Sequence, residues 1–466
     1  MLHAKRLAVA DAGSSTPDPA SILAQWPRDR PVALLHAGAG AATAARWSLI
    51  GTPTRGETLD VGVFEGVLGE APASDDRARD AAKAWMARNL GTACGGEAPC
   101  TDERPPFSNG RLAVLAYELG AILEPAARDR RRPRPRLGDG PLAFSASLDD
   151  ALAFDHADGT WWRIDEAPRP IEPPRRDVAS EGGPWSLSPL QPDGGDESFE
   201  ASVRRCVELI HAGDLFQANL AERFTATLEG SPRDLAAAAL RRGAARFGGY
   251  VEISPDLAVL SLSPELFLAT GAWSGSPRGV VTCPIKGTRP TGADLEAFAN
   301  DPKDAAELAM IVDLMRNDLG RVCRPGSVRV VEPRRFEAHP TVVHGVAEVR
   351  GELREPLGLD ALLEATFPPG SVTGAPKIRA MQVIDELEPL PRGFYCGSLG
   401  WVDDRHGLVL NVAIRTAMLR RDRHAASERW HVEYHAGCGI VADSDPAAES
   451  AERRDKTAVL AQWARR

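Results

Sequence analysis

The spacing of hydrophobic positions in the second half of the chain predicts several amphipathic helices. In residues 303–320, apolar side chains recur every three or four residues, at Leu308, Ile311, Leu314 and Met315. This spacing places the four side chains on one face of an α-helix, which is typical of a helix packed on a hydrophobic core. The same kind of pattern predicts helices over 357–366, 375–387 and 446–463, and another that begins near Phe199.

Short apolar runs between these helices predict β-strands. The candidates are residues 258–263, 328–332, 397–403, 407–419 and 429–437. In the last run Trp430, Val432 and Tyr434 alternate with polar residues, as expected for an antiparallel strand with one face in water. Strands and helices do not alternate in the regular order of a parallel sheet, so the pattern indicates an α+β fold.

Polar segments rich in proline, glycine and arginine suggest how the chain is divided. They cover residues 95–110, 124–140 and 166–197. The third is the best candidate for a boundary, because regular hydrophobic patterns begin directly after it. We therefore expect an N-terminal region of residues 1–195 and a catalytic domain of residues 196–466. The arginine-rich run in 124–140 has interleaved prolines and no aromatic residues, which is typical of a solvated loop.

Charge and composition exclude several classes of function. The 466-residue chain has a formal net charge of −10, which argues against a nucleic-acid partner, because such proteins bind through a basic face. No apolar stretch approaches the length of about 20 residues that a membrane helix needs, so we expect no membrane partner. Seven scattered cysteines without zinc-ligand spacing, and an N-terminus without the apolar core of a secretory signal, lead us to expect a cytoplasmic protein.

Two of the expected helices carry pairs of carboxylates. Asp304 and Glu307 are three residues apart, and Glu449, Glu452 and Lys456 recur at spacings of three and four. Residues at these spacings are neighbours on a helix surface. The two helices could jointly hold a hard divalent cation such as Mg²⁺, which is bound through a few carboxylates together with substrate oxygens. Alternatively, both faces are solvated and carry ion pairs only.

Lys286 lies in an unusual setting within the segment TCPIKGTRPTG, residues 282–292. It follows a β-like run that ends at Pro284 and precedes Gly287. A glycine at this point allows another group to approach the backbone closely, which would suit an amine held at a binding site. A solvated lysine on a surface loop is the simpler alternative.

Seven segments, in this order along the chain, together resemble one family, the chorismate-utilising enzymes. This family includes anthranilate synthase component I, aminodeoxychorismate synthase component I, and the isochorismate and salicylate synthases. The matching segments are SLSPELF (261–267), PIKGTRP (284–290), AELAMIVDLMRNDLGRV (306–322), FPPGSVTGAPKIRAMQVIDELE (367–388), YCGSLGW (395–401), IRT (414–416) and GIVADSDPAAESAERRDK (439–456). The resemblance implies two large antiparallel β-sheets packed together with helices outside, and an N-terminal region that contributes to the same core.

The resemblance also implies a role for each matching position. It implies that Mg²⁺ is bound by Glu307 and Glu452, with Asp304 and Glu449 beside them, and that Glu265 is a general acid. The positions implied to surround the substrate chorismate are Gly287, Thr288, His344, Thr373, Trp401, Arg415, Gly437, Cys438, Gly439 and Lys456. Trp401 stands where tyrosine is usual in the family.

Lys286 distinguishes between branches of the family. Anthranilate and isochorismate-forming relatives carry a small residue at this position, whereas the aminodeoxychorismate synthases carry a lysine that attacks C2 of chorismate. The resemblance therefore implies formation of 4-amino-4-deoxychorismate from chorismate and ammonia, in para-aminobenzoate and folate biosynthesis. The chain lacks a Gly-x-Cys-x-Gly glutaminase signature, so a separate glutamine amidotransferase subunit (component II) is implied as a partner. The alternatives are anthranilate synthase component I, isochorismate synthase, and a non-catalytic subunit.

Overall fold

The fold is described from a computed structural model of the 466-residue chain. The residues described are 5–7, 16–37, 46–60, 72–91, 105, 107, 110–128, 138–164, 184–242, 245–338, 342–354, 357–403 and 405–464. The polar segments 95–110, 124–140 and 166–197 lie partly outside these residues.

Among the described residues, 21 strands form one hydrogen-bonded network in which the paired strands are antiparallel. The strands are β1 (Lys5–Arg6), β2 (Ala33–His36), β3 (Trp47–Leu59), β4 (Arg111–Leu115), β5 (Ala143–Asp155), β6 (Thr160–Arg163), β7 (Ser186–Leu187), β8 (Gln191–Pro192), β9 (Gln217–Glu229), β10 (Gly248–Ser254), β11 (Leu257–Ser261), β12 (Leu266–Thr270), β13 (Gly279–Cys283), β14 (Ile285–Pro290), β15 (Arg329–Ala338), β16 (Val342–Glu352), β17 (Gly374–Ala375), β18 (Ser398–Asp403), β19 (Gly407–Asn411), β20 (Thr416–Arg421) and β21 (Arg429–Ile440).

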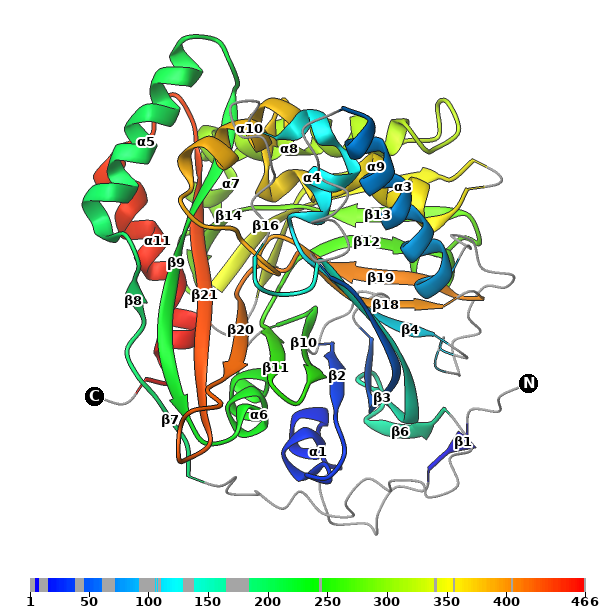
Figure 1. Ribbon diagram of the computed structural model, residues 1–466. Helices are drawn as coiled ribbons and strands as arrows, with labels where there is room; N and C mark the ends of the chain where they lie inside the picture. The colour runs from blue at the N-terminus through cyan, green and yellow to red at the C-terminus, as the bar shows by residue number, and fades with distance from the viewer. Residues whose placement is uncertain are drawn as a thin grey trace.

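The network folds into two sheets that pack against each other (Figure 1). The first follows the order β9, β21, β20, β11, β10, β2, β3, and the second the order β4, β18, β19, β12, β13, β16, β15. The long strand β5 pairs with both β3 and β4 and so joins the two sheets. The expected pair of packed sheets is therefore confirmed, and the structure adds that their strands are continuously hydrogen-bonded.

Helices cover the outer faces of both sheets (Figure 1). The α-helices are α1 (Pro19–Gln25), α3 (Pro72–Asn89), α4 (Leu119–Leu123), α5 (Gly195–His211), α6 (Pro232–Arg242), α7 (Leu295–Ala299), α8 (Pro302–Gly320), α9 (Leu359–Thr366), α10 (Lys377–Leu387) and α11 (Pro446–Ala461), and the short 3-10 helices are η2 (Pro125–Ala127), η3 (Gly271–Ser274) and η4 (Gly370–Val372). None of the helices within the described residues is both long and apolar enough to cross a membrane.

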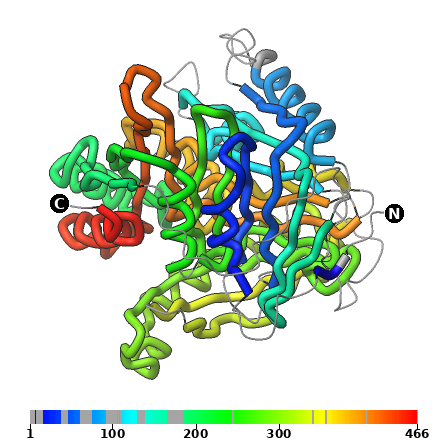
Figure 2. Tube along the Cα trace, turned by 90° about the horizontal axis from the view of Figure 1, so that it is seen from below, coloured from blue at the N-terminus to red at the C-terminus, as the bar shows by residue number. Residues whose placement is uncertain are grey.

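The N-terminal region completes the same core as the rest of the chain. Strand β2 pairs with β10 and β4 pairs with β18, so strands from both sides of residue 195 are neighbours in each sheet. Figure 2 shows the N-terminal strands, in blue to cyan, running through the middle of the molecule. Helix α5 begins at Gly195, next to the expected boundary. The division into two domains at that point stays a prediction.

Most of the expected helices and strands are present with small shifts at their ends. Helix α8 buries the stripe expected from its sequence. Asp445 caps α11 by accepting a hydrogen bond from the backbone N–H of Ala448, and Pro446 follows at the first helical position, where its missing N–H costs nothing. The local sequence signals were therefore sufficient to predict the buried face of α8 and the start of α11.

The single strand expected over residues 407–419 is wrong. The structure breaks it into β19, which ends at Asn411, and β20, which begins at Thr416. Strand β19 pairs with β12 and β18 in the second sheet, whereas β20 pairs with β11 and β21 in the first. The intervening residues carry the chain from one sheet to the other, and hydrophobicity alone did not reveal this crossing because both strands are apolar.

Candidate active site

Two neighbouring crossings between the sheets position the first pair of candidate residues. Residues 262–265 connect β11 to β12, and residues 412–415 connect β19 to β20. The crossings are hydrogen-bonded to each other, from the Val412 N–H to the Glu265 carbonyl (3.0 Å) and from the Leu262 N–H to the Arg415 carbonyl (2.9 Å). Glu265 and Arg415 are thus fixed by the topology of the fold.

Arg415 adopts a left-handed backbone conformation with φ of 53°. A non-glycine residue in this region costs of the order of 1–3 kcal/mol and is found mainly at functional sites. Burial lowers the pKa of its guanidinium, although Tyr434 and Glu265 oppose this effect. The guanidinium stays charged because the ordinary pKa of arginine is far above neutrality. A partly buried cation of this kind is suited to bind a carboxylate of a ligand.

Glu265 is almost completely buried, with 3% of its surface exposed. Burial raises the pKa of its carboxyl group to about 7, even though Ser371, Lys286 and Arg415 each favour the ionised form. The Oε1 atom has no hydrogen-bond partner among the described residues. A carboxyl group with these properties holds a proton near neutral pH and can donate it to a reacting group.

Lys286 is the second residue of β14, and its amine faces several charged side chains. Burial lowers the pKa of this amine, and the positive charge of Lys456 lowers it further. The carboxylates of Glu307, Glu265 and Glu452 act in the opposite direction, but the net shift is downward. A lowered pKa raises the fraction of neutral amine, which is the nucleophilic form.

Gly439 on β21 allows Lys286 and a second side chain to approach each other. A Cβ atom at Gly439 would lie 2.5 Å from the Nε2 atom of Gln217 and 3.2 Å from the Nζ atom of Lys286. A side chain at position 439 would therefore displace one or both of these groups. The expectation that Gly439 belongs to the site has this steric explanation.

Gln217 was not identified from the sequence. It is the first residue of β9 and is completely buried, and neither its Oε1 nor its Nε2 atom has a hydrogen-bond partner among the described residues. Leaving a buried amide unpaired costs about 1–3 kcal/mol, so this side chain is suited to a ligand that supplies the missing partners. The signal in the sequence that could have identified Gln217 is a glutamine on the buried face of an expected strand.

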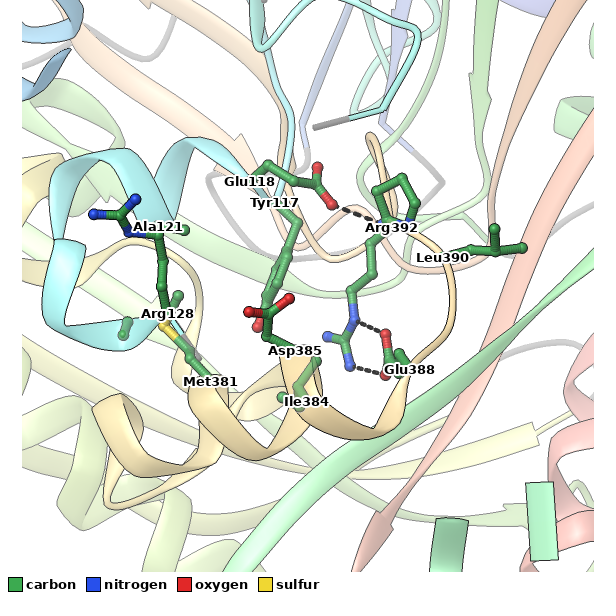
Figure 3. A pocket seen from close by; sticks show the side chains of 12 residues that line it. Tyr117, Glu118, Ala121, Arg128, Met381, Ile384, Asp385, Glu388, Leu390 and Arg392 are labelled. Carbon is green, nitrogen blue, oxygen red and sulfur yellow. Dashed lines mark hydrogen bonds and ion pairs between the residues drawn. The ribbon is translucent and has the colours of Figure 1, made fainter. Parts of the chain in front are cut away.

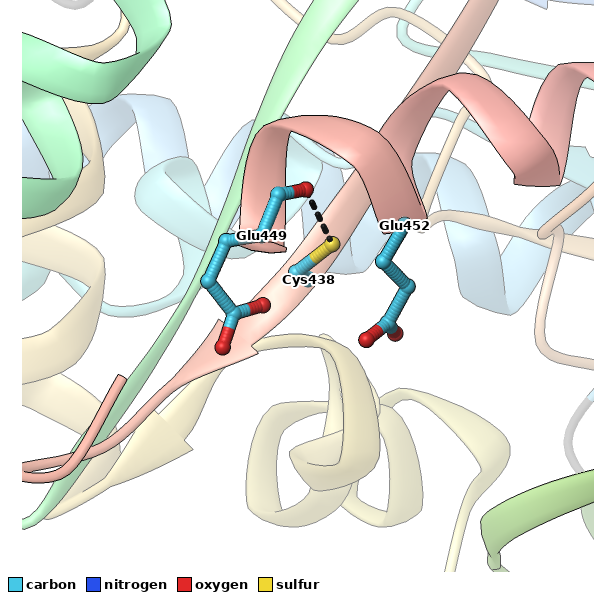
Figure 4. Close-up of side chains that lie close together, drawn as sticks. All are labelled: Cys438, Glu449 and Glu452. Carbon is cyan, nitrogen blue, oxygen red and sulfur yellow. Dashed lines mark hydrogen bonds between the residues drawn. The ribbon is translucent and has the colours of Figure 1, made fainter. Parts of the chain in front are cut away.

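Helix α11 and the end of β21 form a group of possible metal ligands (Figure 4). The ligand atoms of Cys438, Glu449 and Glu452 lie within 4.8 Å of one another. Burial raises the pKa of the Cys438 thiol well above its usual range, and the sulfur donates to the carbonyl of Glu449 at 3.4 Å. The thiol is therefore protonated, which leaves the two carboxylates as the donors of this group.

Lys456 links this group to the strand beside it. Its Nζ donates to the carbonyl of Gly437 at 2.8 Å and pairs with Glu452 at 2.7 Å. Burial lowers the pKa of this lysine, but Cys438, Glu452 and Glu449 outweigh that effect and the net shift is upward. Lys456 thus remains a cation, and its pKa is shifted in the opposite direction from that of Lys286.

Helix α8 contributes the third carboxylate, from Glu307. Burial raises the pKa of Glu307, with smaller contributions in the same direction from Asp304 and Glu452. Its charge also acts on Lys286, and that of Glu452 acts on Glu307, so Glu307 lies within electrostatic range of both residues. Helices α8 and α11 therefore bring glutamates to the same region, as the sequence pattern indicated.

Asp304 differs from these glutamates in its partners. Its carboxylate binds Arg289 at 2.8 Å and lies 4.0 Å from Arg334. Gly287 makes this arrangement possible, because a Cβ atom there would lie 2.9 Å from the Asp304 carboxyl carbon. Asp304 remains close enough to Glu307 to raise the pKa of that glutamate, but its carboxylate makes ion pairs, and its place beside a metal ion stays a prediction.

Three further residues were expected to surround the substrate, and each has different neighbours in the structure. His344 is buried and its Nδ1 lies 2.8 Å from the Thr288 hydroxyl. The Thr373 hydroxyl is turned to the carbonyls of Pro369 and Gly370, at 3.2 Å each. Trp401 lies in the core between the two sheets.

The ring of Trp401 packs against two aromatic rings, at centroid distances of 5.0 Å from Phe107 and 5.1 Å from Trp273. Because successive side chains of a strand alternate between the faces of the sheet, Trp401 belongs to the opposite face from Val402, which packs under the outer helices. The structure therefore gives Trp401 a packing role and does not bring it to the other candidate residues.

A buried ion pair supports the wall behind the site (Figure 3). Arg392 binds Glu388 and also donates to the carbonyls of Val372 and Asn219, at 3.1 and 2.5 Å. Glu118 accepts hydrogen bonds from the backbone N–H groups of Arg392 and Gly393. The cavity beside these residues has a volume of only about 50 Å³. We assign this network to structural support of β9 and the segment before β17.

Comparisons with known proteins agree with this geometry. A family profile for chorismate binding enzymes matches residues 70–462. Aminodeoxychorismate synthase component 1 of Klebsiella aerogenes is 38% identical over 363 residues, which cover 75% of this chain and 76% of that protein. Anthranilate synthase component 1 of Streptomyces coelicolor is 36% identical over 399 residues, which cover 78% of this chain and 74% of that protein.

A solved structure extends the similarity to the fold. The crystal structure of anthranilate synthase component I from Streptococcus pneumoniae TIGR4 superposes with a TM-score of 0.68 at 26% identity, and the match covers 90% of this chain and 92% of that one. The profile match spans most of the catalytic segments and both sheets. The chain therefore belongs to the chorismate-binding enzyme family.

Proposed function

We propose that this chain is the large subunit of an aminodeoxychorismate synthase, which converts chorismate and ammonia to 4-amino-4-deoxychorismate for para-aminobenzoate and folate biosynthesis. The observation that carries the proposal is Lys286, an amine with a lowered pKa that lies near the general-acid candidate Glu265 and beside the unpaired amide of Gln217. The similarity to aminodeoxychorismate synthase component 1 of other bacteria supports the same assignment.

The first step of the proposed reaction is attack by the neutral Lys286 amine on C2 of chorismate. A nitrogen–carbon bond forms at C2, the two ring double bonds shift, and the bond between C4 and its hydroxyl group breaks. Glu265 donates its proton to the departing hydroxyl, which leaves as water. The lysine nitrogen then loses a proton, so the product of this step is a secondary amine that links Lys286 to the ring.

In the second step ammonia enters at C4 and the lysine leaves from C2. Ammonia attacks C4, the double bonds shift back, and the bond between C2 and the lysine nitrogen breaks. The lysine nitrogen recovers a proton as it leaves, and the ammonium group formed at C4 loses one. The enolpyruvyl group remains attached throughout, so no pyruvate is released. Arg415 would hold a carboxylate of the substrate during both steps.

A magnesium ion is part of the proposal, and the residues present fit it. Glu449 and Glu452 place oxygen donors close together, and Glu307 would add a third from α8. Oxygen is the ligand type that Mg²⁺ prefers, and its remaining positions would be taken by water and substrate. The protonated Cys438 would not be a ligand. When bound, the ion would neutralise and orient the ring carboxylate of chorismate.

Removal of one of these carboxylates should weaken metal binding. We expect Glu307→Gln and Glu452→Gln each to lower activity at limiting Mg²⁺ by about tenfold or more, because a ligand to the cation is lost. Titration of activity with Mg²⁺, together with calorimetric binding of Mg²⁺ alone, checks this. Asp455→Asn, on the exposed face of α11, is the matched control. Unchanged Mg²⁺ dependence in both glutamine variants would contradict the metal assignment.

Gln217 should show opposite effects on stability and activity. In Gln217→Leu we expect the free energy of unfolding to rise by about 1–3 kcal/mol, because a buried unpaired amide is replaced by an apolar group. We expect activity to fall by about tenfold or more, because the bound ligand loses a hydrogen-bonding partner. Denaturant unfolding and steady-state kinetics measure the two effects.

The matched control for Gln217 is Gln382, whose amide donates to the carbonyl of Ala126 at 2.6 Å. Gln382→Leu removes a satisfied hydrogen bond and should not raise the stability. If Gln217→Leu is destabilised and fully active, the amide has a structural role only.

The nitrogen source is a further part of the proposal. We expect a glutamine amidotransferase subunit to supply ammonia, since the relatives are named as component 1 of their enzymes and the chain has no glutaminase signature. A cytoplasmic location is consistent with the five cysteines of the described residues, all of which are free thiols.

Identification of the product tests the proposed function. Chorismate, ammonium and Mg²⁺ should give 4-amino-4-deoxychorismate, detected by mass spectrometry. Anthranilate with release of pyruvate would assign the chain to the anthranilate synthases instead. Isochorismate formed without any nitrogen source would assign it to the isochorismate synthases.

A further inference from the structure

Exposed apolar side chains gather where α5 leads into β9. Phe216 is 71% exposed and Ile378, in the first turn of α10, is 41% exposed. Pro376 is also exposed and follows Ala375, whose carbonyl accepts a hydrogen bond from the backbone N–H of Phe216. Contiguous exposed apolar surface can mark a site of contact with another protein. We name Phe216, Pro376 and Ile378 the α5–α10 patch.

Two interactions hold the two halves of the patch side by side. The backbone N–H of Phe216 donates to the carbonyl of Ala375 at 2.8 Å, and Arg379 pairs with Asp214 at 2.7 Å. The patch therefore lies on a fixed backbone, with an ion pair at its edge. An apolar centre with a polar rim is the usual anatomy of a protein–protein interface.

The patch lies on the outside of a wall of the candidate active site. Gln217 follows Phe216 directly in the chain, but it is completely buried, and its Nε2 atom lies near the same point over Gly439 as the Nζ atom of Lys286. Behind Pro376, the short strand β17 pairs with the start of β9. The exposed Phe216 and the buried amide beside the lysine thus belong to consecutive residues, 216 and 217. Figure 1 shows this start of β9 next to α10 at the top of the molecule.

We propose that the α5–α10 patch is the docking surface for the glutamine amidotransferase subunit. This inference rests on the proposed function, which requires ammonia at C4 of the ring whose C2 is attacked by Lys286. Ammonia is mostly protonated, and so not nucleophilic, in neutral water. A subunit that releases it must therefore dock close to the site, and the patch is the exposed apolar surface that adjoins a wall of that site.

Two other exposed apolar side chains provide a contrast. Val331 on β15 is 52% exposed and Leu295 on α7 is 50% exposed. Neither is adjacent in the chain to a residue of the candidate site, and no second large apolar side chain is exposed within four residues of either in the chain. The adjacency of Phe216 to the buried Gln217, together with a second large exposed apolar side chain on the neighbouring α10, therefore selects the patch as the docking surface.

Substitutions in the patch should separate glutamine-dependent from ammonium-dependent activity. We expect Phe216→Asp and Ile378→Asp each to weaken binding of the purified amidotransferase subunit of the same organism by roughly thirtyfold, the effect of removing an interface hot spot. Glutamine-dependent formation of 4-amino-4-deoxychorismate at limiting amidotransferase should fall in parallel. Activity with ammonium should stay within about twofold of wild type. Val331→Asp is the matched control and should change neither activity.

The outcomes are distinct. Unchanged binding and glutamine-dependent activity in both patch variants would overturn the proposal, as would failure of the wild-type chain to bind the amidotransferase. If the aspartate variants also lose activity with ammonium, Phe216→Ala is the deciding variant. Normal activity with ammonium together with weakened amidotransferase binding would support the docking proposal. Equal loss of the ammonium-dependent and glutamine-dependent activities would overturn the proposal. A wild-type chain that self-associates only through this patch would also overturn it. Absence of the expected product from chorismate and ammonium in wild type would instead reject the proposed function.

Discussion

Replacing Lys286 with alanine should lower the rate of 4-amino-4-deoxychorismate formation by roughly a thousandfold or more, because the covalent route is lost with its nucleophile. The lowered pKa of this amine raises the fraction of the neutral form, which is the form that reacts. The cavity left by the side chain adjoins Gly439 and Gln217, so ammonia or water gains access to C2. Traces of 2-amino-2-deoxyisochorismate, anthranilate or isochorismate are therefore expected, and liquid chromatography with mass detection measures all of them.

An arginine at position 286 is the matched control for this prediction. It preserves the positive charge, but guanidinium is always protonated and is not a usable nucleophile. Lys286→Arg should therefore be as inactive as Lys286→Ala. Substantial activity in Lys286→Arg would mean that the lysine only pairs with a substrate carboxylate.

Replacing Glu265 with glutamine should have the second largest effect. Loss of a positioned general acid lowers rates by about a hundredfold to ten-thousandfold. The pKa of Glu265 is raised to about 7 by burial, so the carboxyl group is protonated below this pH and ionised above it. Because the proton must be present when the hydroxyl leaves, the activity that depends on Glu265 should decline as the pH rises through about 7. The pH dependence of kcat/KM for wild type and Glu265→Gln checks this.

Glu118 provides the matched control for the pH dependence. Burial raises its pKa to about 7 as well, but it accepts hydrogen bonds from the backbone at Arg392 and Gly393 and supports the wall behind the site. Glu118→Gln should leave the pH dependence of kcat/KM unchanged. A decline near pH 7 that persists in Glu265→Gln and disappears in Glu118→Gln would contradict the role assigned to Glu265.

The helices could be predicted from the sequence because their signals are local. The stripe from Leu308 to Met315 fixes the buried face of α8, and Asp445 with Pro446 fixes the start of α11. The carboxylates on those helices then reach the same region through the fold, which the family resemblance anticipated. Glu265, Lys286 and Arg415 lie in segments that match the family, and their roles stay predictions.

The features that could not be predicted depend on tertiary partners. Asp304 has the same helical spacing as a metal ligand would have, but Arg289 reaches it from β14. Trp401 faces the core between the sheets because of the register of β18. Gln217 stands out only when its buried amide is seen without partners among the described residues. Each outcome depends on which distant strand or helix lies next to the residue, and no local pattern contains that information.

Intact mass spectrometry of the chain incubated with chorismate and Mg²⁺, without ammonia, tests the covalent role of Lys286 most directly. The account predicts a wild-type species heavier by the mass of chorismate less one water, located at Lys286 by peptide mapping, absent from Lys286→Ala and discharged as 4-amino-4-deoxychorismate when ammonium is added. Product formation by a wild type that never carries this adduct, even under rapid quenching in acid, would contradict the covalent mechanism.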